Sequence, residues 1–257
     1  MIEWAAVLKK KDLKKAYIIC GEEEYIRQKA VRALIETLSL NFPELNHTVL
    51  DARTKVSELI MACETLPMMD EKRLVRVKNY ESLSGKGEDT KLLEEYIIKI
   101  PESTILLFDT AGKADKRRRL YKSVEKLGQV KEFNKPPFPK IIESVLTEAK
   151  HRNLIFNRDS ASALIRQCGD DLYTLVNELD KLAVIKDNGA VTKTDILEVV
   201  CKSLEYDVFS LHRLFMEGKS VQALALFNEV LEAEKSPFGM IGIIAARFRL
   251  RKKIKPP

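Results

Sequence analysis

The sequence lacks the features that would place it in several special classes of protein. Its four cysteines, Cys20, Cys63, Cys168 and Cys201, are far apart and form no CxxC pair, which excludes a disulfide scaffold and a zinc ribbon. No apolar run approaches the ~20 residues of a membrane span. The start of the chain carries Glu3 and has no basic segment or cleavage site, so it is not a secretory signal. We therefore expect a cytoplasmic protein with no membrane partner.

Motifs for catalysis are missing as well. The three histidines are scattered, with no HExxH pattern, and GxSxG does not occur. A P-loop needs GxxxxGK[ST] between a strand and a helix, because its amides, lysine and hydroxyl hold the phosphates and Mg²⁺. At that place Gly21 is followed by the carboxylates of Glu22–Glu24, which suit a helix dipole but repel a triphosphate. These absences predict a protein without chemistry of its own, without a cofactor and without a metal site.

Asp109 ends an apolar strand, where a nucleotide-hydrolysing fold carries a Mg²⁺-binding acid. The next residue is Thr110, whereas an ATPase usually has a glutamate there to activate water. With no P-loop opposite it, we expect Asp109 to be a helix cap or a hydrogen-bonding loop residue.

The net charge of +6 is concentrated at one end of the chain. Six of the 44 cations lie in residues 247–257, which contain no acid, so the remaining 38 cations match the 38 acids. A free-standing DNA-binding module would be basic over much more of its length. The charge distribution therefore speaks against that class.

Apolar runs and amphipathic stripes alternate in the first half of the chain. The expected strands are Ala16–Cys20, His47–Asp51, Arg73–Val77, Thr104–Asp109 and Gln129–Glu132. The helices expected between them span residues 24–38, 56–63, 92–98 and 116–127. Strands that alternate with helices predict a parallel sheet covered on both faces, so residues 1–136 are expected to form an α/β domain.

Three prolines in residues 134–139 predict a linker, and we expect only helices after it. Residues 137–204 are predicted to be a small helical domain that ends with a short helix, capped by Thr192 or Thr194. Residues 205–257 are predicted to contain three further helices with a thin core, over residues 206–217, over residues 220–233 and from residue 236 onward. We expect this third domain to be incomplete.

Two segments are candidates for binding. Leu66, Pro67, Met68 and Met69 follow a helix that the proline ends, and they predict either core packing under the next strand or a projecting contact surface, for which methionine is well suited. A basic cluster, residues 113–122, contains a single acid and predicts either a solvated helix face or a phosphate contact. The residues alone favour core packing and the solvated face.

Five segments, taken in order, resemble the delta-subunit family of the bacterial DNA polymerase III clamp loader. They are YIICGEEEY at Tyr17–Tyr25, LPMMDEKRLV at Leu66–Val75, DKRRRLYK at Asp115–Lys122, GDDL at Gly169–Leu172 with NELDKL at Asn177–Leu182, and YDVF at Tyr206–Phe209. Each segment is only moderately specific, but five in the right order are a strong signal, and the resemblance runs from about residue 10 to 250.

The resemblance implies an AAA+ architecture. Residues 1–136 would be a RecA-like α/β domain without a functional P-loop, residues 137–204 a helical lid domain, and residues 205–257 part of a helical collar domain. Family members of this pattern do not bind ATP. The implied partners are the sliding clamp (beta), the tau/gamma and delta prime subunits of the loader, and primed DNA within the assembled complex.

The resemblance also implies the site. The family binds and opens the sliding clamp, for loading onto primed DNA during replication, through an apolar pair that ends the helix before the third strand, and this position matches Leu66, Met68 and Met69. Lys116, Arg117, Arg118 and Arg119 are candidate DNA or phosphate contacts. The chain would then be a non-catalytic part of a DNA polymerase holoenzyme. The alternative is an active AAA+ NTPase of loader or helicase type. The absence of a P-loop lysine and hydroxyl after Gly21 argues against this alternative.

Overall fold

A computed structural model describes residues 13–80, 83, 91–186, 189–200, 214 and 218–233 of the chain. The chain divides into two compact units, Met1–Pro136 and Pro137–Pro257, and the division falls in the proline-rich segment. The predicted boundary between residues 204 and 205 lies outside the described residues. The predicted helix from residue 236 also lies outside them, as does all of the helix predicted over 206–217 except Leu214.

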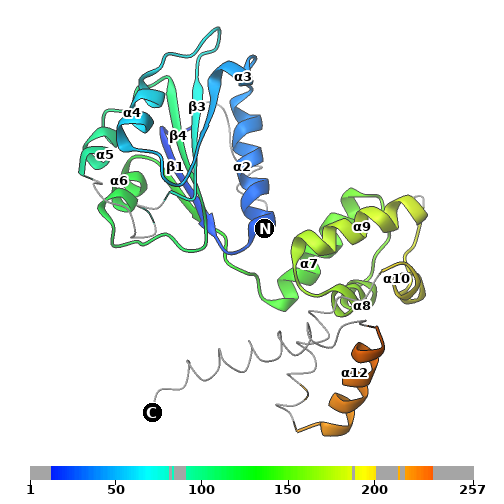
Figure 1. The fold of residues 1–257 in the computed structure, drawn as a ribbon. Helices are drawn as coiled ribbons and strands as arrows, with labels where there is room; N and C mark the ends of the chain where they lie inside the picture. Colours follow the sequence, from blue (N-terminus) through cyan, green and yellow to red (C-terminus); the bar gives the residue numbers. More distant parts are fainter. Residues whose placement is uncertain are drawn as a thin grey trace, which may run out of the picture. The chain divides into compact units, whose positions relative to one another are not determined.

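A five-stranded sheet forms the centre of the first unit (Figure 1). Its order is β2-β3-β4-β1-β5, and every neighbouring pair is parallel. The strands are β1 (Ala16–Gly21), β2 (His47–Leu50), β3 (Arg73–Lys78), β4 (Thr104–Ala111) and β5 (Gln129–Glu132). The predicted parallel α/β fold is therefore confirmed, although β4 continues beyond its predicted end at Asp109.

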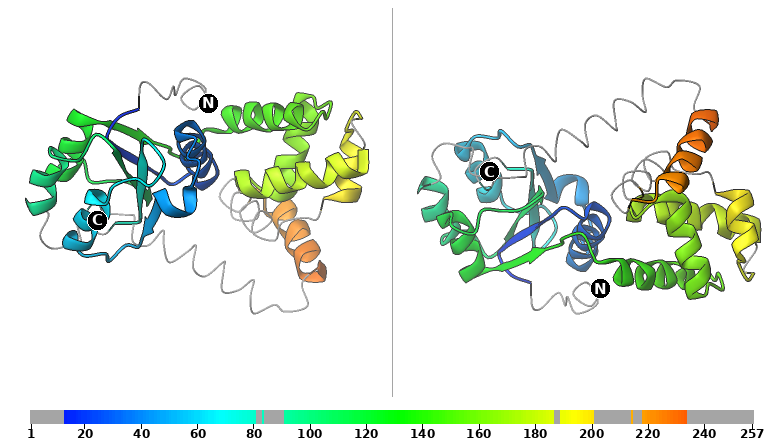
Figure 2. Two further views of the ribbon diagram at one scale, coloured as in Figure 1. Left: turned by 90° about the horizontal axis from the view of Figure 1, so that it is seen from above. Right: turned by 90° about the horizontal axis from the view of Figure 1, so that it is seen from below.

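Helices cover both faces of this sheet. They are α2 (Glu24–Leu38), α3 (Pro43–Asn46), α4 (Val56–Glu64), α5 (Lys91–Ile97) and α6 (Arg119–Leu127). Ile18 of β1 belongs to a core that includes Leu59 of α4 and Leu93 of α5, whereas its neighbour Ile19 packs with Leu34 of α2. Figures 1 and 2 show the same division, with α4, α5 and α6 on one face of the sheet and α2 on the other.

Two local features of the first unit differ from the sequence prediction. The short helix α3 was not predicted; it begins at Pro43, whose fixed φ suits a first helical turn. Helix α6 begins at Arg119 rather than at Lys116, because the Asp115 carboxylate accepts the backbone N–H of Arg117 at 3.0 Å in a turn that precedes the helix.

Among the described residues of the second unit, helices are the regular secondary structure, apart from a single bridge between Ile155 and Ala190. Its helices are α7 (Phe138–His151), α8 (Arg158–Cys168), α9 (Leu172–Lys186), α10 (Lys193–Val199) and α12 (Ser220–Ala233). Helix α8 packs against α7, α9 and α10. Thr192 is the cap of α10, and it exchanges hydrogen bonds with Asp195 in a capping box. Within the described residues, no helix has the length and apolarity that a membrane crossing requires.

The predicted linker is shorter than expected. Helix α7 begins at Phe138 and includes Pro139 in its first turn. Proline is tolerated there because the first N–H groups of a helix have no intrahelical partner.

Candidate functional site

The two edges of the sheet carry different structures. In a parallel sheet, the segments that precede the strands lie at one edge and the segments that follow them lie at the other. The carboxyl-terminal edge, where open α/β sheets usually bind ligands, contains the turn from β1 to α2 at Gly21–Glu23. The amino-terminal edge contains α3, which precedes β2, and the segment from Leu66 to Asp70, which precedes β3.

The turn after β1 is closed by contacts with the chain itself. The N–H of Gly21 donates to the carbonyl of Gly112 at 2.7 Å, and the N–H of Glu23 donates to the carbonyl of Phe133 at 3.0 Å. A Cβ on Gly21 would lie 2.0 Å from that Phe133 oxygen, so the backbone passes too close for any side chain. Amides that a P-loop would direct at phosphates are here bonded within the protein.

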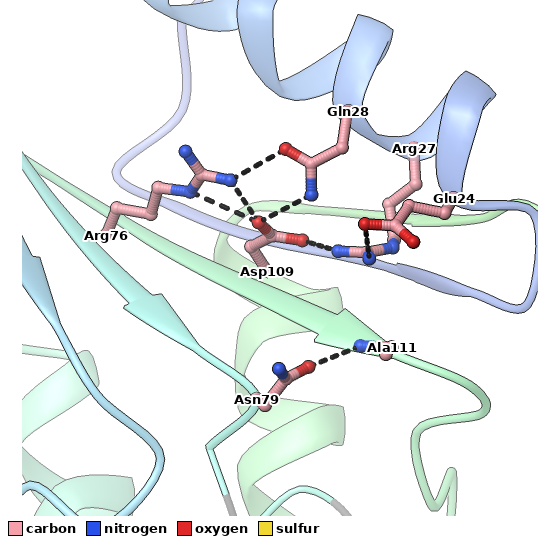
Figure 3. Close-up of polar contacts among 7 residues, drawn as sticks. All are labelled: Glu24, Arg27, Gln28, Arg76, Asn79, Asp109 and Ala111. Carbon is pink, nitrogen blue, oxygen red and sulfur yellow. Dashed lines mark hydrogen bonds and ion pairs between the residues drawn. The ribbon is translucent and has the colours of Figure 1, made fainter. Parts of the chain in front are cut away.

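Asp109 lies between two arginines on the α2 side of this edge, as Figure 3 shows. Its side chain is 2% exposed and accepts from Arg27 of α2 through Oδ1 and from Arg76 of β3 through Oδ2. Gln28 also donates to Oδ2, at 3.3 Å. The expectation that Asp109 caps a helix or bonds within a loop is wrong, because its carboxylate is the shared counterion of two guanidinium groups. Two such cations beside one carboxylate repel a divalent metal.

The segment at the amino-terminal edge exposes three apolar side chains. Leu66 is 75% exposed, Met68 58% and Met69 79%. Core packing, which the residues alone favoured, is therefore wrong for these three positions. We call Leu66–Met69 the apolar loop.

Helix α4, which leads into the apolar loop, is fastened at its last carbonyls. The Thr104 hydroxyl donates to the carbonyl of Cys63 at 2.8 Å, and the buried Arg73 guanidinium donates to the carbonyl of Thr65 at 2.9 Å. These bonds satisfy carbonyls that a helix end leaves without partners, and a cation suits that end of the helix dipole. The apolar loop therefore starts from a fixed point.

The other end of the apolar loop is held by α3 and the residues before it. The Asn46 amide is bonded to both backbone groups of Met68, each at 2.8 Å. The Asp70 carboxylate accepts the backbone N–H groups of Asn41 at 3.0 Å and Phe42 at 3.1 Å. These bonds, the Asn41 N–H first, hold the pKa of Asp70 below its ordinary value. Sequence reasoning missed Asn46, since no local pattern indicates a partner 22 residues away.

The basic cluster is partly neutralised by neighbouring acids. Lys116 forms an ion pair with Glu132 at 2.8 Å, which raises the pKa of the lysine, and Arg117 forms one with Asp115 at 3.0 Å. Arg118 precedes α6 as its N-cap and Arg119 is its first residue. A DNA contact through these four residues stays a prediction.

Cysteine and metal chemistry find no support among the residues that the structure describes. No group of three or more His, Cys, Asp or Glu side chains in that part of the chain could hold a metal ion. Burial raises the pKa of both Cys63 and Cys168 to about 12. Their thiols stay protonated at neutral pH, which makes them poor nucleophiles and poor metal ligands.

Comparison with known proteins gives consistent matches. Residues 17–134 match the family described as DNA polymerase III, delta subunit. The DNA polymerase III subunit delta of Bacillus subtilis is 27% identical over 253 residues, which cover 95% of this chain and 73% of that protein. The solved structure of the Bacillus subtilis DNA clamp loader delta protein (YqeN) has 26% identity and a TM-score of 0.71, over 97% of this chain and 77% of the other.

A more distant structure also matches, the gamma subunit-related DNA polymerase III protein of Thermotoga maritima. Its identity is 13% and its TM-score 0.43, over 94% of this chain and 81% of the other, a likeness too low to support an inference. The resemblance inferred from the five sequence segments is confirmed, because residues 17–134 match the family model of the DNA polymerase III delta subunit and both Bacillus subtilis matches are delta proteins.

Proposed function

We propose that this chain is the non-catalytic clamp-loader subunit that binds the sliding clamp through Leu66, Met68 and Met69 and opens it for loading onto primed DNA. The observation that carries the proposal is the exposure of these three apolar side chains on a loop fastened at both ends. The loop also occupies the position at which the resembled family is expected to bind its clamp.

The energetics favour a protein partner for the apolar loop. Burial of apolar surface contributes roughly 25 cal/mol per Å². The three side chains gain little of this free energy within the chain, because each is more than half exposed. A few apolar anchors usually dominate a protein interface, each worth ~2 kcal/mol or more when truncated. Methionine adapts its shape to a partner's pocket, which suits this role.

Clamp opening would follow from differential binding. A ligand shifts a conformational equilibrium only by binding one state more tightly than the other. The apolar loop would therefore bind more tightly to a clamp whose ring interface has opened. This step needs no nucleotide chemistry in the subunit itself.

Two features of the carboxyl-terminal edge support a subunit that does not use ATP. The turn at Gly21–Glu23 is bonded to Gly112 and Phe133, and Asp109 is paired with Arg27 and Arg76. A Mg-nucleotide would have to break these contacts and then overcome the repulsion from Glu22–Glu24. The same features weigh against the alternative, an active AAA+ NTPase of loader or helicase type.

The remaining partners follow from the family rather than from a site in this chain. We include association with the tau/gamma and delta prime subunits, and with primed DNA inside the complex, in the proposal. Direct DNA contact by Lys116–Arg119 has the weakest support, since Lys116 and Arg117 are paired with acids.

The proposal is tested by the affinity of the full chain for the purified cognate sliding clamp. Met68→Ala combined with Met69→Ala should weaken binding about tenfold or more, because ~1.4 kcal/mol is enough for that. The melting temperature should barely change, because both side chains are exposed. Val184→Ala with Ile185→Ala removes a comparable exposed pair from α9 and should leave the affinity unchanged. Unchanged clamp affinity in a well-folded Met68/Met69 variant would refute the proposal.

A further inference from the structure

The apolar loop is held against α3 by a set of polar contacts that Asn46 and Asp70 make. We propose that these two residues, named here the polar clasp, are positioning residues that fix the apolar loop in its clamp-binding conformation before the clamp arrives. This inference rests on the proposed function, and it adds to the site two residues that would not touch the clamp themselves.

Both polar atoms of the Asn46 side-chain amide make hydrogen bonds in the polar clasp. Its Oδ1 accepts the N–H of Met68 at 2.8 Å, and its Nδ2 donates to the carbonyl of Met68 and to Oδ2 of Asp70, each at 2.8 Å. The side chain pairs with Met68 as a neighbouring strand would. Asn46 is 1% exposed, and a buried amide is tolerated only when such bonds satisfy it. The hydrogen bonds that allow the Asn46 amide to be buried therefore form only when the apolar loop has this conformation.

Asp70 completes the polar clasp from within the loop segment. Its Oδ1 accepts the backbone N–H and the side-chain amide of Asn41, and its Oδ2 accepts the N–H of Phe42 together with the Asn46 amide. Four bonds to one carboxylate fix its position relative to α3. The segment is thus pinned on both sides of Met69, at Met68 and at Asp70.

Met69 has a backbone conformation that needs such support. Its φ is +58°, in the left-handed region that residues other than glycine, asparagine and aspartate rarely adopt. Unfavourable backbone conformations persist where the surroundings over-determine them, and they gather at binding and catalytic sites. Here the surroundings are the polar clasp, and the conformation it maintains is one in which Met68 and Met69 both face solvent.

Pre-ordering of the loop has a measurable consequence for affinity. A flexible loop would lose conformational entropy on binding, and that loss would weaken the complex. With the polar clasp intact, the loop is ordered during folding instead. Substitutions that remove the polar clasp should therefore weaken clamp binding only when Met68 and Met69 are present to contact the clamp.

A double-mutant cycle separates positioning from a general loss of stability. Its four proteins are the wild type, Asn46→Ala, the Met68→Ala/Met69→Ala pair, and the triple variant. We expect Asn46→Ala to weaken clamp binding about tenfold in the wild-type background and less than about twofold when the methionines are absent. Asp51→Ala is the matched control, because this exposed aspartate accepts the N–H of Arg53 in a loop at the opposite edge. It should leave clamp affinity unchanged.

The outcomes distinguish the two proposals. If the methionine pair matters but Asn46→Ala has no effect, or has the same effect in both backgrounds, the clasp inference is overturned and the proposed function stands. If the methionine pair has no effect in folded protein, the proposed function fails, and the clasp inference fails with it.

A second variant covers the case in which Asn46→Ala does not fold. Asp70→Asn keeps the size of the side chain but turns an acceptor into a donor that faces the N–H of Phe42 and the Asn46 amide. It should reproduce the background-dependent loss in the same cycle. It should also speed the hydrogen exchange of the Met68 amide, followed by NMR without the clamp. Equal exchange rates and unchanged affinity would overturn the inference.

Discussion

The two edges of the sheet use similar polar contacts to opposite effect. At the carboxyl-terminal edge, bonds to Gly112 and Phe133 close the turn after β1, and Arg27 and Arg76 neutralise Asp109. At the amino-terminal edge, Asn46 and Asp70 are equally well bonded, but their contacts hold apolar side chains out in solvent. Hydrogen bonds thus fill the usual ligand position at one edge and hold an exposed apolar loop, the proposed clamp-binding surface, at the other.

The comparison shows how the usual ligand position of an α/β sheet can be filled by the chain itself while the sheet is kept. Ligand sites in open α/β sheets depend on free amides and charges at the carboxyl ends of the strands. When the chain's own groups take those amides and charges, the sheet remains as a scaffold. A loop at the far edge can then carry the function without competing with a nucleotide site.

The largest effect on stability is expected at the carboxyl-terminal edge, from Asp109→Ala. This change leaves Arg27 and Arg76 without their shared counterion, and Arg27 is buried. The loss of one partner from a buried ion pair destabilises by about 3–5 kcal/mol. Urea denaturation should show this decrease in the free energy of unfolding. Asp51→Ala, at an exposed loop aspartate, should change it by less than ~1 kcal/mol. A similarly small change for Asp109→Ala would mean that charge neutralisation does not hold this edge together.

Gly21→Ala should have the next largest effect. The added Cβ would meet the Phe133 carbonyl, and the φ of +132° is unfavourable for alanine in any case. Gly112→Ala is the matched control, because Gly112 also has a positive φ, of +75°, but no atom lies within 4 Å of its Cβ. The control should lose ~1–2 kcal/mol from backbone strain alone, and Gly21→Ala should lose a further ~1–3 kcal/mol from the steric clash. Equal losses in thermal melting would contradict the close packing of the turn.

The smallest effect concerns the titration of Asp70 at the amino-terminal edge. Hydrogen bonds hold the pKa of Asp70 below its ordinary value of 3.8, so its carboxylate stabilises the folded state above that pH. This stabilisation is lost only as the pH falls through the lower, folded-state pKa. The Asp70 carboxylate therefore stays charged between about pH 5 and 8, and its titration should not change clamp affinity in that range. An NMR titration of the Asp70 carboxyl carbon checks the direction, since a midpoint above 3.8 would show that the polar clasp does not hold the charged form.

Local patterns were sufficient to predict most of the fold. The five strands were located to within a few residues because buried apolar runs and turn residues are adjacent in sequence. Helix α12 has the predicted bounds, Ser220–Ala233. Helix α3 was not predicted, and the start of α7 was assigned to a linker, although proline also begins helices.

The site was only partly accessible to sequence reasoning. The residues alone identified Leu66–Met69 as a candidate but favoured core packing, and only the family resemblance favoured an exposed contact surface. The pairing of Asp109 with Arg27 and the contact of Asn46 with Met68 were missed, because 82 and 22 residues separate the partners. Contacts of this kind depend on which strands become neighbours, and local periodicity does not carry that information.

Hydrogen–deuterium exchange tests the contrast between the edges most directly. The full chain would be measured alone, with the cognate sliding clamp, and with Mg-ATP. We predict that the clamp slows exchange in the segment from Leu66 to Asp70 and leaves the turn at Gly21–Glu23 unchanged, whereas Mg-ATP changes neither. Protection of the turn by Mg-ATP, or a clamp complex in which the apolar loop exchanges as fast as in the free chain, would contradict the account.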